Sequence, residues 1–219
     1  KINFQVPNMW FIFVETKSEM SVSICENMDC MEAMKAFPDK YFELAVVDPP
    51  YGLGNKTMAG GTWAKKHAKA KEWDKLLEQG VVDFILQLSD KVILWGGNYY
   101  QVPPSRCWLS FRKTNALKTG SDFELAWTNF DKCCKEFAAA CNSEGRRQHP
   151  TQKPVALAEW CFQNYGEPKS VLDLFLGSGS TLIACEKTNR KCYGMELDPK
   201  YCDVILKRWE DFTGQKAEL

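Results

Sequence analysis

The stretch "VLDLFLGSGSTLIACE", residues Val171 to Glu186, indicates the fold around which the rest of the chain can be arranged. An apolar run ends at Asp173, two glycines follow at Gly177 and Gly179, and a helical pattern begins directly after them. Glycines at such a turn let the backbone approach a ligand closely, and the first N–H groups of a helix are free to bind it. The third glycine of the dinucleotide fingerprint G-x-G-x-x-G is missing, so a pyrophosphate is not the obvious ligand.

Apolar runs of strand length recur along the chain, and helical patterns lie between most of them. This alternation predicts an α/β fold with a doubly wound, mostly parallel sheet of seven strands. The two runs before and after residues 113–122 leave no room for a helix, so we expect an antiparallel hairpin at one edge. The predicted strands cover residues 21–25, 43–47, 91–95, 107–112, 123–128, 170–175 and 191–197.

Length and composition predict one domain over residues 1–219, since 45% hydrophobic residues suffice for one sizeable core. Residues 53–72 combine glycine and asparagine breakers with lysines and show no period, which predicts a long mobile loop. A second irregular segment is expected at 131–148. Residues 1–20 form an N-terminal extension to which no role is assigned.

The charge and cysteine content narrow the class of protein. Basic and acidic residues are balanced at 28 each, so any nucleic-acid contact must come from a local basic face. Ten cysteines without a CxxC pair predict free, buried thiols and no metal site. The longest early apolar run, residues 9–14, is too short to cross a bilayer, so we expect a cytoplasmic protein without a membrane partner.

Two further strand ends carry polar residues. The run "LAVVDPPYG", Leu44 to Gly52, stops at a carboxylate, two prolines and a tyrosine. Such a turn could simply cap and end a strand, or it could present Asp48 to a ligand. The strand at 191–197 ends at Glu196, in the place where a carboxylate grips a ribose diol in nucleotide-binding α/β folds. The sequence therefore predicts a ligand that contains a nucleoside.

These motifs resemble the S-adenosylmethionine-dependent amino methyltransferases that act on DNA bases, whose sheet is Rossmann-like. In that family "D-P-P-Y" is the catalytic signature, and "F-x-G-x-G" and a segment like "HPTQKP", here residues 149–154, flank the cofactor. The catalytic turn precedes the glycine loop, as in the group usually called β. The resemblance implies catalytic roles for Asp48, Pro49, Pro50 and Tyr51. It implies binding of S-adenosyl-L-methionine by Asp29, His149, Thr151, Lys153, Asp173, Phe175, Gly177, Ser178, Gly179 and Glu196.

The chemistry of a base amine explains the catalytic turn. An exocyclic amine is a poor nucleophile because its lone pair is delocalised into the ring, so acceptors must draw the nitrogen toward tetrahedral geometry. The Asp48 carboxylate and the Pro49 carbonyl can be such acceptors, and hydrogen bonds to charged groups contribute about 1.5–3 kcal/mol each. Tyr51 can stack on a base flipped out of the helix.

The predicted function is therefore transfer of a methyl group to the N6 amine of adenine in DNA. Family members acting on cytosine more often begin the motif with Ser, which favours adenine here. Cytosine N4 or RNA as acceptor, a non-catalytic nucleic-acid-binding protein and a dinucleotide-dependent oxidoreductase remain alternatives. Substrate contacts are expected from Trp63, Lys65, Lys66, Arg146 and Arg147, of which the lysines could equally be a solvated surface run.

The segment where β-group enzymes carry a target-recognition domain is short here, at residues 131–148. Base discrimination should then rest on short loops or on the second subunit of a homodimer, and we expect a short or relaxed target site.

Overall fold

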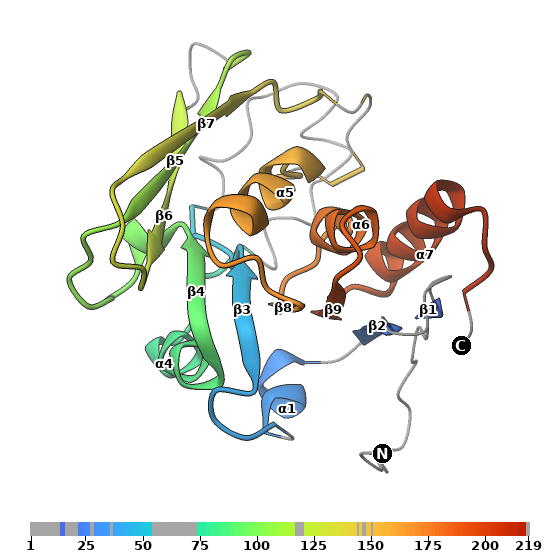
Figure 1. Ribbon diagram of the computed structural model, residues 1–219, viewed down its shortest axis with the longest axis horizontal. Helices are drawn as coiled ribbons and strands as arrows, with labels where there is room; N and C mark the ends of the chain where they lie inside the picture. The colour runs from blue at the N-terminus through green and yellow to red at the C-terminus, as the bar shows by residue number, and fades with distance from the viewer. Residues whose placement is uncertain are drawn as a thin grey trace.

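A nine-stranded sheet runs through the part of the chain that the computed structural model describes, with the strand order β1-β2-β9-β8-β3-β4-β6-β5-β7 (Figure 1). The described residues are 14–15, 22–26, 29–35, 37–53, 74–116, 121–143, 145, 148–149 and 151–217. The strands are β1 (Val14–Glu15), β2 (Val22–Glu26), β3 (Phe42–Val47), β4 (Ser89–Trp95), β5 (Trp108–Lys113), β6 (Phe123–Thr128), β7 (Lys135–Ala139), β8 (Ser170–Asp173) and β9 (Lys191–Met195).

Helices cover both faces of the sheet, with α1 and α4 on one side and α5, α6 and α7 on the other (Figure 1). The alternation of side chains along β3 explains this arrangement. Leu44 and Val46 pack in the core on the α5–α7 side, whereas Ala45 and Val47 pack in the core on the α1–α4 side. The helices are α1 (Cys30–Met34), α4 (Gln79–Leu88), α5 (Val155–Asn164), α6 (Ser180–Lys187) and α7 (Pro199–Thr213), with a 3-10 turn η2 (Gly97–Tyr99).

The predicted α/β sheet is confirmed, since each of the seven predicted runs forms a strand and most of their pairings are parallel. The strands β5 and β6 form the expected antiparallel pair. The hairpin is not outermost, however, because β7 pairs parallel to β5 and occupies that edge. The expectation of an irregular segment at 131–148 is therefore wrong over Lys135–Ala139. This strand is short, and the charged Lys135 and Glu136 are exposed, so it has no apolar alternation.

The helix starts follow the local sequence. At α7 the Asp198 side chain accepts a hydrogen bond from the Lys200 N–H over 3.0 Å, and Pro199 occupies the first turn, where a missing N–H costs nothing. Helix α5 begins directly after Pro154. Both helices therefore begin beside a proline, which a first helical turn tolerates.

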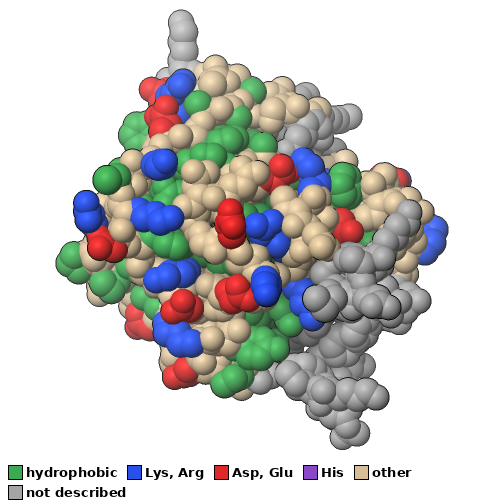
Figure 2. All heavy atoms as spheres, viewed as in Figure 1, with side chains coloured by type: hydrophobic (Ala, Val, Ile, Leu, Met, Phe, Trp, Pro, Cys, Tyr) green, Lys and Arg blue, Asp and Glu red, His purple; other side chains and the backbone are tan. Residues whose placement is uncertain are grey.

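Surface and thiol properties partly match expectation. The described cysteines are free, but Cys133 and Cys134 are exposed, unlike the buried thiols that we predicted. On the face seen in Figure 2, Lys and Arg side chains are interspersed with Asp and Glu, in line with the balanced composition. Among the described helices, none has the length and apolar character needed to cross a bilayer. A cytoplasmic location stays a prediction.

Candidate active site

Three neighbouring parallel strands bring the predicted motifs together. β3 pairs with β8 and β8 pairs with β9, so the turns that follow them lie side by side at the carboxyl edge of the sheet. A cavity of about 1410 Å³ opens there and is lined by Asp48, Gly177 and Glu196 among others. Asp48, Gly177 and Glu196, to which the resemblance assigns catalytic and cofactor-binding roles, therefore border one pocket.

The turn after β3, which the family resemblance makes the catalytic turn, is held by two tyrosines. The Tyr51 hydroxyl donates a hydrogen bond of 2.5 Å to Asp48 Oδ1, and the Tyr100 hydroxyl donates to the Pro50 carbonyl. Burial, and the Asp48 carboxylate next, raises the pKa of Tyr51 well above its ordinary value, so its hydroxyl remains a donor. The turn therefore has one defined geometry, with both Asp48 and Tyr51 facing the cavity.

The Tyr51 ring lies in a narrow slot. It stacks on Tyr99, with ring centroids 5.1 Å apart and planes inclined by 22°. Gly96, at a φ of +70°, lies so close to the ring that an added Cβ would be 2.0 Å from it. Tyr99 thus covers one face of Tyr51, and a base that stacks on that face must first displace Tyr99.

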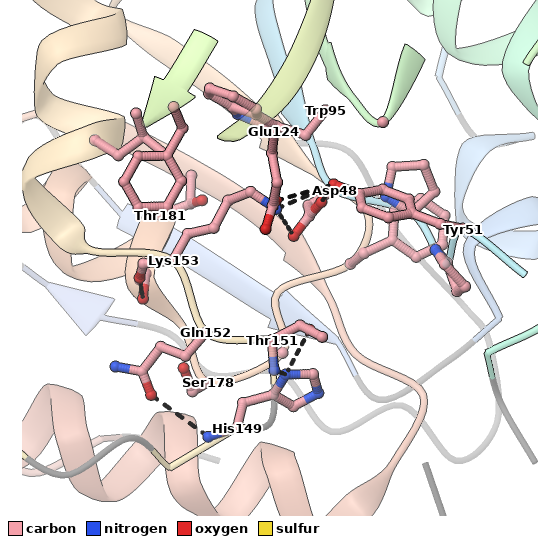
Figure 3. Close-up of a pocket in the computed structure, with 18 of the residues that line it drawn as sticks. Asp48, Tyr51, Trp95, Glu124, His149, Thr151, Gln152, Lys153, Ser178 and Thr181 are labelled. Atoms are coloured by element: carbon pink, nitrogen blue, oxygen red, sulfur yellow. Dashed lines mark hydrogen bonds and ion pairs between the residues drawn. The ribbon is translucent and has the colours of Figure 1, made fainter. Parts of the chain in front are cut away.

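Lys153 reaches the catalytic turn, whereas the resemblance placed it beside the cofactor. Its Nζ forms an ion pair with Asp48 Oδ2, a second with Glu124 Oε2 at 3.0 Å, and donates to the Tyr51 hydroxyl at 3.2 Å (Figure 3). Glu124, on β6, also pairs with Lys113 on β5 at 2.6 Å. These side chains are mostly buried, with at most 25% of any of them exposed. Two carboxylates and two ammonium groups therefore form one compact cluster.

Mutual attraction sets the ionisation of this cluster. Burial raises the pKa of Asp48, the Lys153 ammonium lowers it, and the Glu124 carboxylate raises it again, leaving it above its ordinary value. Burial also raises the pKa of Glu124, but Lys153 and Lys113 outweigh burial and hold that pKa at about 2. Burial lowers the pKa of Lys153, but the two carboxylates raise it by more. Lys153 is therefore a cation at neutral pH.

The glycine loop between β8 and α6 forms the other end of the cavity. The Gly177 N–H donates a hydrogen bond of 2.8 Å to Glu196 Oε2, and the Asp198 N–H donates one of 2.9 Å to Oε1 of the same carboxylate. Asp173 accepts from the Phe175 N–H at 3.0 Å. Gly177 has a φ of +55°, a conformation that costs residues with a Cβ about 1–2 kcal/mol.

The two carboxylates at this end are unusually easy to protonate. Burial raises the pKa of Glu196 to about 7, although the Asp198 and Gly177 N–H groups lower it, and burial raises the pKa of Asp173 to about 6. A group that donates hydrogen bonds or brings positive charge would restore their ionised forms. This end of the cavity is therefore suited to a ligand with hydroxyl donors and a cationic centre.

His149 and residues 151–153 lie between the two ends. His149 packs on Tyr201 with ring centroids 4.4 Å apart, and its Nδ1 lies 3.1 Å from the Thr151 hydroxyl oxygen. The Ser180 hydroxyl donates a hydrogen bond of 2.8 Å to the Lys153 carbonyl. His149 and Thr151 line the cavity, and a Cβ on Gly177 would lie 3.6 Å from the His149 ring.

The other residues that the sequence analysis assigned to the site lie in different surroundings. Asp29 lines the cavity while its Oδ1 accepts from the Met31 N–H at 2.8 Å. Ser178 is buried and its hydroxyl accepts from Arg208 at 3.0 Å. A Cβ on Gly179 would lie 3.2 Å from Ile205, so this glycine packs against α7. The predicted substrate-binding residues Trp63, Lys65, Lys66, Arg146 and Arg147 lie outside the described residues.

The sequence analysis missed five residues of the catalytic end, namely Gly96, Tyr99, Tyr100, Lys113 and Glu124. Only Glu124 left a signal, because it is the one charged residue in the apolar run of β6.

Comparison with known proteins identifies the family. A family model described as "DNA methylase" matches residues 100–207. The Type II methyltransferase M.HinfI of Haemophilus influenzae is 37% identical over 249 aligned positions, which cover 87% of this chain and 69% of that protein. This chain belongs to the DNA methylase family. It is a DNA methyltransferase of the N6/N4 type, and this family uses S-adenosylmethionine.

Other similar proteins agree with this assignment. A putative methylase, YubD, of Escherichia coli K12 is 26% identical over 79% of this chain and 84% of its own length. Among solved structures, the cytosine-N4-specific PvuII DNA methyltransferase has a TM-score of 0.60 at 16% identity, covering 85% of this chain and 86% of that one. The M1.HpyAVI–SAM complex has a TM-score of 0.54 at 18% identity, covering 84% and 98%. This chain therefore has the same fold as these two methyltransferases.

Proposed function

We propose that this DNA methylase transfers a methyl group from S-adenosylmethionine to the N6 amine of an adenine flipped out of DNA. The observation that carries the proposal is that one cavity joins the Asp48 carboxylate to the glycine loop and Glu196. Asp48 also supports adenine through the family resemblance, and the position of the catalytic turn ahead of the glycine loop supports the β group.

The residues at the glycine loop fit the cofactor. Asp29, Asp173, Glu196 and Asp198 line that end, while the lysines among the described lining residues, Lys113 and Lys153, belong to the catalytic cluster. Carboxylates suit the sulfonium and ammonium charges of S-adenosylmethionine and would repel a pyrophosphate. This charge distribution also disfavours the oxidoreductase alternative.

Each end then has a role. Glu196 would accept hydrogen bonds from the ribose hydroxyls, and Asp173 and Asp29 would face the ammonium group. Phe175 and the exposed Leu197 supply apolar surface beside Glu196. Bound there, the cofactor supplies an electrophilic methyl group.

At the other end, Asp48 accepts a hydrogen bond from the amine and localises the nitrogen lone pair for attack. The nitrogen becomes positively charged as it forms the new bond, and Asp48 can take the proton that it must lose. Tyr51 and Tyr100 keep the carboxylate and the prolines in place through the bonds described above. A base and a cofactor that fill this end would exclude water, which strengthens the hydrogen bonds to the amine.

Incubation of the full chain with tritiated S-adenosylmethionine and unmethylated duplex DNA, followed by digestion to nucleosides, tests the proposal. We expect label in N6-methyladenosine nucleosides. Label in N4-methylcytosine would instead establish the cytosine alternative, and label only with RNA would change the substrate class. Calorimetry should show binding of S-adenosylhomocysteine and none of NAD. A chain that binds neither cofactor nor labels any nucleic acid would refute an enzymatic role.

Segment 131–148 is short, and β7 takes up five of its residues, so few residues are left there to contact DNA bases. A short or relaxed target site therefore remains our proposal. A homodimer that adds to base reading also remains a proposal. Methylation mapping that shows a long, strictly read site would contradict the first of these.

A further inference from the structure

The Lys153 ammonium occupies the acceptor that a base amine would need. An ammonium group has three N–H donors, and Lys153 directs them to Asp48, Glu124 and the Tyr51 hydroxyl (Figure 3). Tyr51 in turn donates to the other oxygen of Asp48. Both oxygens of the catalytic carboxylate therefore already accept a hydrogen bond from within the protein.

An ammonium held on Asp48 works against the proposed chemistry. The amine competes with a full positive charge for Asp48 Oδ2, and that charge draws away the electron density that should polarise the amine. Simply withdrawing Lys153 into the protein is no solution, because an unpaired buried charge is strongly destabilising. The ammonium needs a second anion within reach.

Glu124 is that second anion. It already lies 3.0 Å from the Lys153 Nζ and 2.6 Å from the Lys113 Nζ. With Asp48, the cluster contains two negative and two positive charges, so it is balanced overall. If Lys153 moves fully to Glu124, both lysines share one carboxylate and Asp48 keeps its whole negative charge facing the cavity.

The path between the two carboxylates is favourable for a cation. The Lys153 Nζ lies 5.6 Å from the centroids of both the Tyr51 and the Trp95 rings. Aromatic faces attract an ammonium group within about 6 Å. A small shift of Nζ from Asp48 toward Glu124 therefore leaves the charge in contact with stabilising partners.

We propose that Glu124 is a positioning residue that takes over the Lys153 ammonium when the base amine arrives, so that Asp48 becomes free to accept the amine. This inference rests on the proposed function, because it gives Asp48 the role of amine acceptor. Neither Lys153 nor Glu124 needs to touch the reacting atoms.

Replacing Glu124 tests the exchange. In E124Q, Asp48 is the one carboxylate among the described residues that still pairs with the Lys153 ammonium, so the single-turnover rate of methyl transfer at saturating cofactor should fall about 10-fold or more. The Kd of S-adenosylhomocysteine should change less than about threefold. The matched control is E159Q, which removes the carboxylate of the Lys187–Glu159 pair between α5 and α6, where the Glu159 side chain is 21% exposed against 22% for Glu124. The control should behave as wild type.

A double variant distinguishes the proposed exchange of the Lys153 ammonium from two other roles of Glu124, which are support of the fold and direct contact with the base. In E124Q/K153M the competing ammonium is gone, so the rate should recover severalfold over E124Q alone. If Glu124 merely supported the fold or bound the base, removing Lys153 as well would lower the rate further or leave it unchanged. Either of those results, or an E124Q rate equal to wild type, overturns the inference.

The wild-type chain separates the two proposals. An active wild type without rescue in the double variant defeats the exchange and leaves the proposed function standing. A wild type that labels no nucleoside defeats the proposed function, and the role of the exchange in methyl transfer with it.

Discussion

At one end of the cavity, Asp48 and Glu124 share the Lys153 ammonium and Glu124 also pairs with Lys113. At the other end, Asp173 and Glu196 accept hydrogen bonds from backbone N–H groups. Burial is common to both ends, but the pKa of Glu124 is held at about 2 while that of Glu196 is raised to about 7. The catalytic end is therefore charge-balanced before any ligand arrives. In the proposed function, the glycine-loop end gains its balance from the bound cofactor.

If the comparison is right, damage to the catalytic end should stop chemistry without affecting cofactor binding. D48A should lower the methyl-transfer rate by about 10²–10³-fold, the size of effect seen when one key electrostatic group of a transition state is removed. Single-turnover kinetics with tritiated cofactor measure this rate. Affinity for S-adenosylhomocysteine, measured by calorimetry, should stay within about threefold of wild type.

D90A, which truncates an exposed carboxylate at the start of β4, serves as the control for D48A and should keep the wild-type rate. A D48A protein that loses rate and cofactor affinity together would mean that the two ends are not separable.

Damage to the glycine-loop end should have the opposite pattern. E196Q should weaken S-adenosylhomocysteine binding by about 10-fold to 100-fold, because a neutral amide replaces a charged acceptor. The methyl-transfer rate at saturating cofactor should remain close to wild type. D203N, at an exposed position of α7, is the control. A normal Kd in E196Q would show that this carboxylate does not hold the ribose.

The smallest effect concerns pH. Because Glu196 has a pKa of about 7 in the free protein, a ligand that needs its ionised form must displace a proton below that pH. Affinity for S-adenosylhomocysteine should therefore fall by about 10-fold from pH 8 to pH 6. Calorimetry in two buffers of different ionisation enthalpy would detect proton release on binding at pH 6.5. E196Q should lose most of this dependence and keep the smaller part that comes from Asp173, whose pKa is about 6. Affinity that rises as pH falls would contradict the assignment.

The sequence predicted the parts of the molecule that local patterns control. The strand runs, the helix after Gly179 and the turns after β3 and β8 each depend on neighbouring residues, and they lie where expected. The adjacency of those two turns followed from the general rule for parallel sheets.

What the sequence did not predict depends on pairing register. Gly96 meets the catalytic turn because β4 pairs parallel to β3, with Leu94 opposite Val47. Glu124 meets it because β6 pairs antiparallel to β4, with Trp95 opposite Ala126. No pattern within either strand fixes that register. Lys153 was assigned to the cofactor because its motif resembles a cofactor segment, yet its long side chain extends to the next site along the cavity. The strand β7 was missed because its exposed, charged residues have little apolar alternation.

Gly96 limits which amino-acid substitutions this protein can accept. Even the smallest replacement, alanine, would place a methyl carbon 2.0 Å from the Tyr51 ring, inside van der Waals contact and on a backbone that already favours glycine. In a saturation library selected for methyltransferase activity, we expect only glycine to be recovered at position 96. At position 99, which contacts the same ring, we expect tyrosine and other aromatic residues. Positions 96 and 99 would thus differ sharply in the substitutions they tolerate, although both contact Tyr51.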